Sequence, residues 1–320
     1  MKILVTGCAG FIGYHVSKKL LDEGHNVVGI DNKNSYYDVK LKDQRLNILR
    51  KSDKFQFHYC DIGSTGASDL IRTKTFDVVV NLAGQAGVRF SRENPDAFYE
   101  SNIKGFYNIL ESCRVGNVKH LVYASSSSVY GNCKSPKFSE TLDVTHPISF
   151  YAASKVSNEV MAKSYKNMFG LRTTGLRFFT VYGPLGRPDM AIYDFTKRII
   201  EGSTITLFND GKNKRDFTYI DDIVNGVVAI VKSENSSDIY NIGNSTPIET
   251  NILVKKLESI LGIKARTEKS DAVIGDVLFT CADTNLLHND FGIMPVVTID
   301  EGLSKFVEWY TDYYEVKLGK

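Results

Sequence analysis

A tyrosine and a lysine four residues apart, Tyr151 and Lys155, follow a run of serines at 125–128. In a helix this spacing puts both side chains on one face. A phenol that can lose its proton, an ammonium that lowers the pKa of that phenol and a hydroxyl that holds the reacting oxygen together suit hydride chemistry on an alcohol. A Tyr and Lys at this spacing are most often mere surface neighbours, so the interpretation depends on what lies upstream.

A glycine-rich turn near the N-terminus supplies that context. Gly7, Gly10 and Gly13 come directly after an apolar, strand-like run and before a helix-length segment. Glycines at this place allow a tight turn, so that the backbone around Phe11 and Ile12 can approach a pyrophosphate at the start of the helix. The turn predicts a dinucleotide cofactor that takes the hydride.

Two acidic positions refine the choice of cofactor. Asp31 closes the next strand-like run, where a carboxylate accepts hydrogen bonds from the ribose hydroxyls and repels a 2′-phosphate. Asn32 rather than Arg follows it, which favours NAD over NADP. Asp61 and Ile62, at the end of the third run, are placed to meet the adenine. Asp61 could equally cap the next helix.

Short apolar runs alternate with helix-length stretches through the first half of the chain. Their hydrophobicity is continuous rather than alternating, which indicates strands buried on both faces, as in a parallel sheet between two helical layers. We expect a doubly wound α/β Rossmann sheet. The predicted strands are 2–6, 26–31, 55–60, 77–82, 120–124 and 171–178.

The length of the chain favours two domains. With 320 residues it is longer than one hydrophobic core usually grows. After about residue 178 the pattern loosens, and glycine and proline become frequent. We expect an NAD-binding Rossmann domain over 1–178, rejoined by about 217–245, and a smaller α/β substrate-binding domain over 179–320. Within the rejoining part, 221–232 reads as a helix and 239–242 as a strand.

Composition excludes several classes of function. Lys+Arg 39 against Asp+Glu 37 leaves a formal net charge of +2, so no nucleic-acid partner is expected. The five cysteines are scattered without CxxC spacing and the six histidines lack ligand spacing, so neither disulfides nor a metal site is expected. No apolar run is long enough for a membrane span or a signal peptide. We therefore expect a cytoplasmic protein.

Several strings together resemble a known family, the extended short-chain dehydrogenase/reductases that act on nucleotide sugars. They are the glycine motif, NLAG at 81–84, SSSSVYG at 125–131 and YAASK at 151–155. Further strings are similar to the UDP-glucuronate 4-epimerases within it, namely NSYYDVKLK at 34–42, GQAGVR at 84–89 and RFFTVYGPLGRPDMA at 177–191. The resemblance covers essentially the whole chain. It adds Leu82 and Ala83 to the expected cofactor contacts.

The resemblance implies a reversible epimerisation at C4 of a UDP-sugar. Tyr151 as phenolate would take the proton of the 4-hydroxyl, giving a transient 4-keto sugar, while NAD stays bound and is recycled. Lys155 would also hydrogen-bond the nicotinamide ribose. Alignment with the family pattern places the substrate-bonding hydroxyl at Ser126, with Ser127 and Ser128 toward the substituent at C6.

The same region separates epimerases from related enzymes. Dehydratases need an acid and a base beside the substrate hydroxyl, and the family's decarboxylases place a Glu just before the Val-Tyr pair. This chain has Ser128 there. Thr180 stands where many hexose epimerases of the family have Asn. With Ser127, Ser128 and Arg187 it forms the expected carboxylate-binding set for a uronic acid.

The nucleotide half of the substrate is also assigned by resemblance. Arg215 is similar to the family's diphosphate-binding arginine, and Asp276 to the acid that meets the uridine ribose. Arg89 could face sugar, diphosphate or solvent. Two positions depart from the pattern: Val273 replaces the usual Arg or Gln, and Leu185 replaces a more usual aromatic residue.

Two amphipathic segments, 98–114 and 150–169, form a dimer interface in relatives, so a homodimer is expected. Alternative functions remain open at this point. The chain could epimerise UDP-glucose or a UDP-N-acetylhexosamine instead. It could be a net dehydrogenase or reductase, against which Asp31 and the pattern of a tightly held cofactor argue. It could also be a non-catalytic NAD-binding scaffold or sensor, although such proteins commonly lose the Tyr or the Lys.

Overall fold

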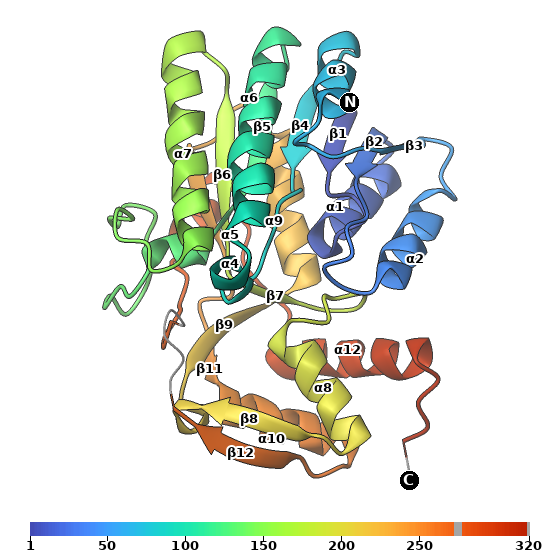
Figure 1. Ribbon diagram of the computed structural model, residues 1–320, viewed down its shortest axis with the longest axis vertical. Coiled ribbons are helices and arrows are strands. Elements are labelled where there is room, and N and C mark those ends of the chain that lie inside the picture. The colour runs from blue at the N-terminus through green and yellow to red at the C-terminus, as the bar shows by residue number, and fades with distance from the viewer. Residues whose placement is uncertain (272–276, 319–320) are drawn as a thin grey trace.

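The chain is built around a seven-stranded sheet with the strand order β3-β2-β1-β4-β5-β6-β10 (Figure 1). The computed structural model describes residues 1–271 and 277–318. Every neighbouring pair in this sheet is parallel, which confirms the expected doubly wound architecture. The strands are β1 Lys2–Thr6, β2 Asn26–Asp31, β3 Phe55–Tyr59, β4 Val78–Asn81, β5 His120–Ser126, β6 Thr173–Phe178 and β10 Ile239–Ile242.

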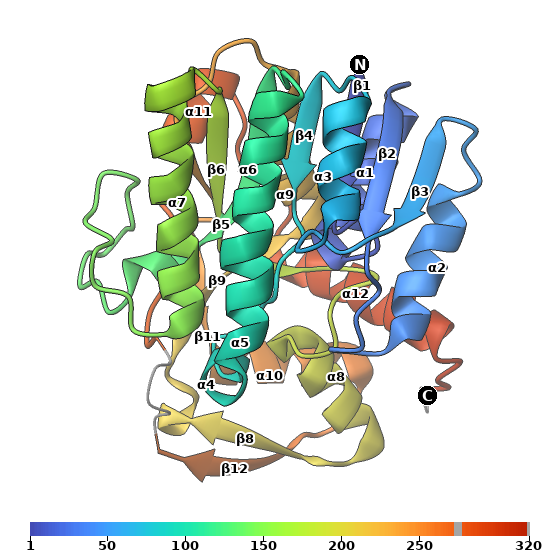
Figure 2. The same cartoon turned by 45° about the horizontal axis from the view of Figure 1, so that its top comes forward.

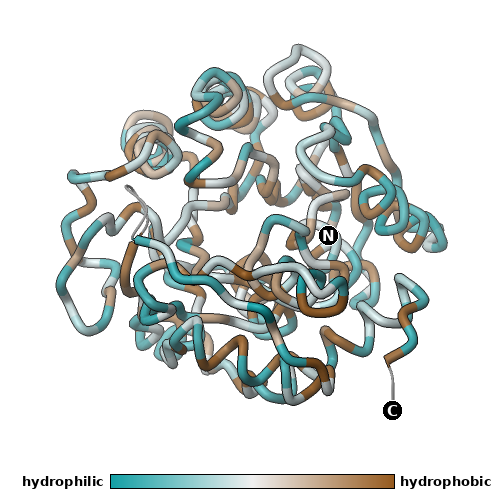
Figure 3. Tube along the Cα trace, turned by 60° about the horizontal axis from the view of Figure 1, so that its bottom comes forward, coloured by the Kyte–Doolittle hydropathy of each residue, from teal (hydrophilic) through white to brown (hydrophobic). Residues whose placement is uncertain are grey.

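Helices cover both faces of this sheet. One layer, in front of the sheet in Figure 2, consists of α3 Thr65–Thr73, α6 Gly105–Val115 and α7 Phe150–Phe169. The opposite layer contains α1 Phe11–Asp22, α2 Val39–Leu49, α9 Ile220–Lys232 and α11 Asn285–Phe291. The outer helices alternate between hydrophilic and hydrophobic residues along their length (Figure 3), as expected of helices that bury one face.

Burial on both faces explains the continuous hydrophobicity of the strands. In β1, Ile3 and Val5 join the core cluster under α1, whereas Leu4 joins the cluster under α3 and α6. All three side chains are fully buried. Each such side chain stabilises the fold by about 2 kcal/mol relative to exposure. A polar residue at any of the three positions would therefore disrupt one helical layer.

The predicted strand ends differ from the observed ones at the serine run. β5 continues to Ser126 rather than stopping at Ala124, because Ser125 and Ser126 pair with Arg177 and Phe178 of β6. A 3-10 turn, Ser127–Tyr130, follows at once. Ser126 therefore stands at the carboxyl end of a central strand.

The helix expected over 98–114 is not a regular α-helix. It consists of α5 Pro95–Phe98, a π-helical turn Tyr99–Lys104 and then α6. Asn102 in the π turn is buried, accepts from Gln85 N at 2.8 Å and donates to Gln85 O at 3.0 Å and to Ser154 Oγ at 3.1 Å. The hydrogen bonds of Asn102 thus tie the loop after β4 to α7, and π-helical turns are frequent at functional sites.

The remaining elements form a smaller body below the carboxyl edge of the sheet (Figure 1). β7 and β9 are parallel and β11 is antiparallel to β9, while β8 and β12 form a separate parallel pair. After β9 the chain runs through α9, which packs on α1, and adds β10 to the main sheet beside β6. The elements of this body are β7 Thr180–Tyr182, α8 Ala191–Glu201, β8 Thr204–Phe208, β9 Lys214–Tyr219, β11 Pro247–Glu249, α10 Thr250–Leu261, β12 Arg266–Ser270 and α12 Ile299–Tyr313. The short helix α4 Phe90–Glu93 packs instead against α5 and α7.

The order of the strands reverses between β1 and β4, and this switch point opens a crevice at the carboxyl ends. Thr6 Oγ1 donates to Asn81 Oδ1 at 2.6 Å and accepts from Ala83 N at 3.0 Å. These bonds fix the ends of both strands at the crevice. Across residues 1–271 and 277–318, no helix combines the length and apolarity needed to cross a bilayer.

Candidate active site

One cavity of about 920 Å³ extends from the glycine turn to the smaller body. It brings together residues that lie far apart in the sequence and that were predicted to bind cofactor, sugar or nucleotide. Asp276 and the departing position Val273 lie outside the described residues. The predicted residues in its lining are Gly7, Gly10, Phe11, Ile12, Gly13, Asp31, Asp61, Ile62, Leu82, Ala83, Arg89, Ser126, Ser127, Ser128, Tyr151, Lys155, Thr180, Arg187 and Arg215.

The first βα turn requires its glycines. Gly7 has a φ of +68°, in the left-handed region that L side chains rarely adopt. A Cβ on Gly13 would lie 2.1 Å from Gly7 O, and one on Gly10 would lie 2.9 Å from the same atom. Any larger residue would push α1 away from the turn. The three glycines thus keep the start of α1 at the cavity.

The start of α1 is suited to a phosphate group. Among the described residues, no side chain caps its first N–H groups, and its first turn holds no acidic residue. Phe11 and Ile12 of this turn line the cavity. The partial positive charge of the helix end is therefore left for an anion.

Asp31 is held at the carboxyl end of β2, with only 8% of its surface exposed. Its carboxylate accepts from Ala9 N at 3.1 Å and from Lys33 N at 2.7 Å. A fixed carboxylate beside a free helix start matches the ribose and pyrophosphate of NAD, so the residues present fit this cofactor.

Asp61 does not cap α3. The N-cap of that helix is Ser64, and Asp61 accepts instead from Gly63 N and from Asn32 Nδ2, each at 2.6 Å. Both Asp61 and Ile62 line the cavity. Their expected contact with the adenine stays a prediction.

Tyr151 and Lys155 lie in the first turns of α7. The Ser149 side chain caps this helix by accepting from Ala152 N at 3.1 Å, which fixes where the helix begins. Lys155 Nζ donates to the Ala124 carbonyl oxygen of β5 at 2.9 Å. It lies 6.0 Å from the centre of the Tyr151 ring.

The electrostatics of this pair differ from the expectation. Burial raises the pKa of Tyr151, and hydrogen bonding with Ser126 and the charge of Arg187 lower it only in part. Burial lowers the pKa of Lys155 to about 8, against the raising effect of Glu159. The expected lowering of the Tyr151 pKa by Lys155 is not seen, because burial is the largest influence on this pKa.

The four serines have different partners. Ser126 Oγ accepts from Ser128 N and donates to Ser128 Oγ, each at 3.1 Å. Ser125 Oγ instead donates to Glu159 Oε1 at 2.5 Å. All four serines line the cavity, but the Ser125 hydroxyl is bonded to Glu159, so Ser126, Ser127 and Ser128 stay the candidates for the sugar.

Glu159 is a residue that sequence reasoning missed. It forms a buried ion pair with Arg177 of β6 at 2.8 Å, and Arg177 Nη1 donates to Tyr130 Oη at 2.9 Å. These bonds tie α7, β6 and the 3-10 turn together beneath the cavity. The available signal was that Glu159 lies four residues after Lys155, on the same helix face.

Arg187 forms an ion pair with Asp189, a residue that the sequence had not indicated. Its guanidinium binds the Asp189 carboxylate through two hydrogen bonds, and Tyr36 Oη donates to Asp189 Oδ2 at 3.2 Å. Burial opposes the charge on both groups, but the pairing raises the pKa of Arg187 and lowers that of Asp189. Tyr36 and Asp189 both line the cavity.

The other predicted substrate residues reach the cavity from different elements. Thr180 is the first residue of β7, and Arg215 lies on β9. The Arg89 guanidinium lies 4.7 Å from the centre of the Phe208 ring. Within the described ranges, no group of three or more His, Cys, Asp or Glu side chains could hold a metal ion.

Comparison with known proteins identifies the family of this chain. The NAD dependent epimerase/dehydratase family model matches residues 3–243. UDP-glucuronate 4-epimerase 1 of Arabidopsis thaliana is 43% identical over 98% of this chain and 77% of its own length. A probable UDP-glucuronate 4-epimerase of Rhizobium meliloti is 40% identical over 98% of both chains.

A solved structure shares the fold over nearly the whole length. UDP-glucuronic acid 4-epimerase of Bacillus cereus, in complex with UDP-glucuronic acid and NAD, has a TM-score of 0.93 at 34% identity and covers 98% of this chain and 100% of its own. The family model spans more than half of the 320 residues, and the resemblance found in the sequence is confirmed. The chain therefore belongs to the NAD dependent epimerase/dehydratase family.

Proposed function

We propose that this protein interconverts UDP-glucuronate and UDP-galacturonate by epimerisation at C4, with NAD as a tightly bound cofactor. The observation that carries the proposal is that one cavity is lined by Tyr151, Lys155 and Ser126 together with the glycine turn, Asp31 and Arg187. The printed activities of the Arabidopsis and Bacillus relatives support it.

NAD, which the glycine turn, Asp31 and Lys155 would hold, would supply hydride uptake from C4 of the sugar and hydride return to the opposite face of the transient 4-keto sugar. Tyr151 accepts the proton of the 4-hydroxyl and gives it back after the sugar has turned over. Ser126 hydrogen-bonds the same sugar oxygen and the phenol. Lys155 would hold the nicotinamide ribose, and its ammonium already lies 6.0 Å from the centre of the Tyr151 ring.

Recognition of the uronic acid falls to residues around C6. Ser127, Ser128 and Thr180 offer hydroxyl donors, and Arg187 offers a cation whose charge Asp189 compensates. Hydroxyl donors hold a carboxylate without bringing a net positive charge near C5, where such a charge would favour loss of CO₂. With Ser128 rather than a Glu before Val129, dehydration and decarboxylation are disfavoured.

The nucleotide is assigned to the smaller body. We propose that Arg215 binds the diphosphate, with Arg89 beside it, and that Asp276 meets the uridine ribose. The guanidinium of Arg215 can bind phosphate oxygens in a bidentate manner. Accordingly, residues 1–178 together with 217–245 bind NAD, and the rest of 179–320 binds the UDP-sugar.

We propose that the enzyme works as a cytoplasmic homodimer in polysaccharide biosynthesis. Apolar side chains on the outer faces of α6 and α7 support the dimer: Tyr107 is 49% exposed, Val160 64% and Met168 62%. These two helices lie side by side (Figure 1). A second copy packed on them would bury an apolar surface that is otherwise in water.

A second candidate is epimerisation of UDP-glucose or a UDP-N-acetylhexosamine. The Arg187–Asp189 pair favours it, because a compensated arginine has less attraction for a sugar carboxylate. The two candidates require the same chemistry at Tyr151 and differ only around C6 and C2.

Proton NMR of the purified protein with each substrate, without added reductant, separates these possibilities. The proposal expects the anomeric signal of UDP-galacturonate to grow from UDP-glucuronate, with little conversion of UDP-glucose or UDP-N-acetylglucosamine. Conversion of a neutral sugar alone would contradict the carboxylate pocket. Absence of any turnover would leave the NAD-binding scaffold as the better account.

A further inference from the structure

The connection that follows β7 is held by side chains from the NAD-binding part of the chain. His15 Nε2 lies 3.0 Å from the Pro184 carbonyl oxygen, and Arg45 donates to the carbonyl oxygens of Leu185 and Gly186, at 2.6 and 3.1 Å from Nη2. Three successive carbonyls of one loop are thus bound by α1 and α2. Arg187 is the next residue along this loop.

Arg45 is fully buried, and it uses all five of its N–H groups. Besides the two loop carbonyls, it donates from Nη1 to Ala9 O at 2.8 Å and to Tyr37 Oη at 2.7 Å, and from Nε to Leu185 O at 3.2 Å. Within the described residues, every acceptor is a neutral oxygen. Burial of a cation among neutral partners costs free energy, which indicates a role for Arg45 beyond packing.

The bond to Ala9 connects this arginine to the cofactor turn. Ala9 lies between Gly7 and Gly10, and its N–H donates to the Asp31 carboxylate at 3.1 Å. The peptide groups of Ala9 are therefore fixed between Asp31 and Arg45. One guanidinium holds both the glycine turn and the loop that carries Arg187.

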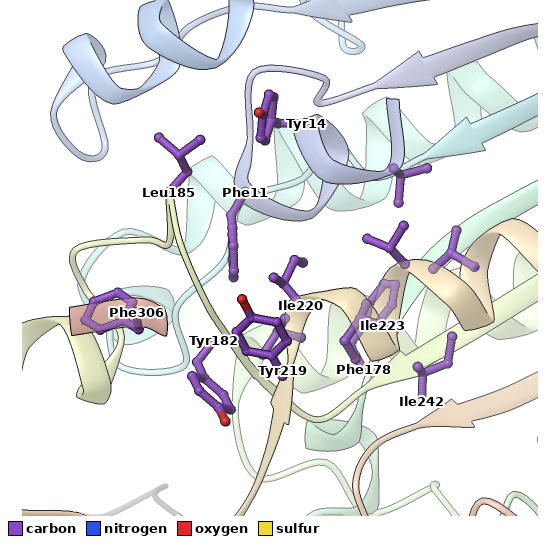
Figure 4. Close-up of a cluster of buried hydrophobic side chains, with 14 of the residues drawn as sticks. Phe11, Tyr14, Phe178, Tyr182, Leu185, Tyr219, Ile220, Ile223, Ile242 and Phe306 are labelled. Carbon is purple, nitrogen blue, oxygen red and sulfur yellow. The ribbon is translucent and has the colours of Figure 1, made fainter. Parts of the chain in front are cut away.

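Leu185 shows that the loop needs such a restraint. Its φ of +56° lies in the left-handed region, which a leucine rarely adopts, and its side chain is buried in the same cluster as Phe11 and Phe306 (Figure 4). Backbone in this region persists only where the surroundings over-determine it. The packed side chain and the doubly bonded Leu185 carbonyl supply that restraint.

The segment that precedes α2 makes a further contact with this loop. Tyr36 donates to Asp189, the ion-pair partner of Arg187, while the adjacent Tyr37 accepts from Arg45. Residues 36–45 thus hold the loop on both sides of Arg187. The position of the Arg187 guanidinium depends on both contacts.

We propose that Arg45 is a positioning residue for substrate selection, which fixes the Arg187 loop relative to the glycine turn and so places Arg187 for the acidic sugar. The lining of the cavity, over residues 1–271 and 277–318, does not include Arg45, so it acts through the loop rather than by contact with substrate. This inference rests on the proposed function, since it takes Arg187 to face the C6 carboxylate.

Arg45→Lys tests the proposal, because lysine keeps the charge but cannot reproduce the planar five-donor fork. We expect KM for UDP-glucuronate to rise about tenfold with kcat within about twofold, and KM for UDP-glucose to change less than about twofold. The matched control is Arg172→Lys. Arg172 also donates only to neutral oxygens, those of Ser233 and Ser236, and lies outside the described cavity lining.

A double-mutant cycle with Arg187→Gln separates positioning from general stability. If Arg45 acts through Arg187, then Arg45→Lys adds little to the KM of the Arg187→Gln variant. Additive effects of the two substitutions would overturn the proposal. Equal KM increases for both substrates, or the same changes in the Arg172→Lys control, would overturn it as well.

Hydrogen exchange of residues 183–190 in the NAD-loaded protein gives a readout that needs no turnover. Arg45→Lys is expected to speed exchange there at least about tenfold relative to Arg172→Lys, and unchanged exchange would contradict the proposed restraint. If the wild type does not convert UDP-glucuronate, the proposed function fails while this readout still tests the loop. If Arg45→Lys does not fold, Tyr37→Phe replaces it, with a KM increase of about threefold expected for UDP-glucuronate and none for UDP-glucose.

Discussion

Lys155 Nζ lies 6.0 Å from the centre of the Tyr151 ring and is anchored to β5 by a 2.9 Å hydrogen bond to the Ala124 carbonyl oxygen. The carbonyl fixes the ammonium in the lining of the cavity, one helical turn from Tyr151. Burial lowers the pKa of Lys155 to about 8, so its charge changes near physiological pH. The protonation state of Lys155 can therefore be followed through the pH dependence of activity.

The activity should depend on pH through the protonation of Lys155. Below its lowered pKa Lys155 is an ammonium, and above about pH 8 it becomes a neutral amine. Activity that needs the ammonium should fall as pH rises, so kcat/KM should show an alkaline limb near pH 8. In Lys155→Arg the guanidinium stays charged, and the limb should move above about pH 10. A limb at the same pH in both proteins would show that another group titrates.

Removal of the phenol should stop the chemistry without loosening the fold. We expect Tyr151→Phe to lower kcat about 10³-fold, because the ring remains but the proton acceptor is lost. Tyr165→Phe is the control, since Tyr165 lies on the same helix and its hydroxyl donates to Glu111 away from the cavity lining that the structure describes. Comparable losses in the two variants would contradict the role of Tyr151. NAD content, measured after denaturation, should stay unchanged in both.

Thr180→Val tests the recognition of the carboxylate. The substitution removes one hydroxyl donor at nearly constant volume, so kcat/KM for UDP-glucuronate should fall about tenfold while that for UDP-glucose changes little. Thr196→Val is the matched control. Thr196 is buried in α8 and its hydroxyl donates to Ile192 O. Equal losses with the acidic and the neutral sugar would contradict the assignment of Thr180.

The Asp31 carboxylate should determine how tightly NAD is held. Asp31→Asn replaces an acceptor oxygen by a donor and should weaken NAD binding about tenfold or more, since hydrogen bonds to charged groups are among the stronger ones. Calorimetric titration of the cofactor-stripped protein with NAD measures this. Asp69→Asn, on the exposed face of α3, should bind as the wild type does. Wild-type affinity in Asp31→Asn would refute the ribose contact.

The buried pair of Glu159 and Arg177 should matter for stability. Their side chains are only 9% and 4% exposed, so Glu159→Gln leaves an unpaired charge in the interior. We expect a loss of about 3 kcal/mol in the free energy of unfolding, measured in urea. Asp22→Asn breaks the exposed pair with Lys18 and should cost less than about 1 kcal/mol. A cost below about 1 kcal/mol for Glu159→Gln would contradict the structural role of the pair.

Local patterns were sufficient to predict the sheet. The continuous apolar run of β1 reflects burial on two faces, and the glycines that follow it reflect a tight turn. Both signals are contained in a few consecutive residues. The end of β5 was harder to predict from the sequence. The polar residues Ser125 and Ser126 belong to the strand only because they pair with Arg177 and Phe178. Propensity alone does not encode that pairing.

The supporting contacts of the site could not be predicted for the same reason. Arg45 lies 140 residues from Leu185, and a single arginine on an amphipathic helix reads as a surface residue. Asp189 stands two residues after Arg187, but the sequence does not show that the two side chains pair within a cavity. The residue types that can carry out the chemistry were visible in the sequence, whereas the residues that bind and orient them depend on long-range packing.

The most direct test of the central claim follows the hydrogen at C4. UDP-glucuronate deuterated at C4 is incubated with the purified protein in ordinary water and the product is examined by NMR. Our account predicts UDP-galacturonate that keeps its deuterium at C4, and no uptake of solvent deuterium at C4 or C5 when unlabelled substrate reacts in D₂O. Loss of the label, or deuterium at C5, would contradict epimerisation through an internally returned hydride.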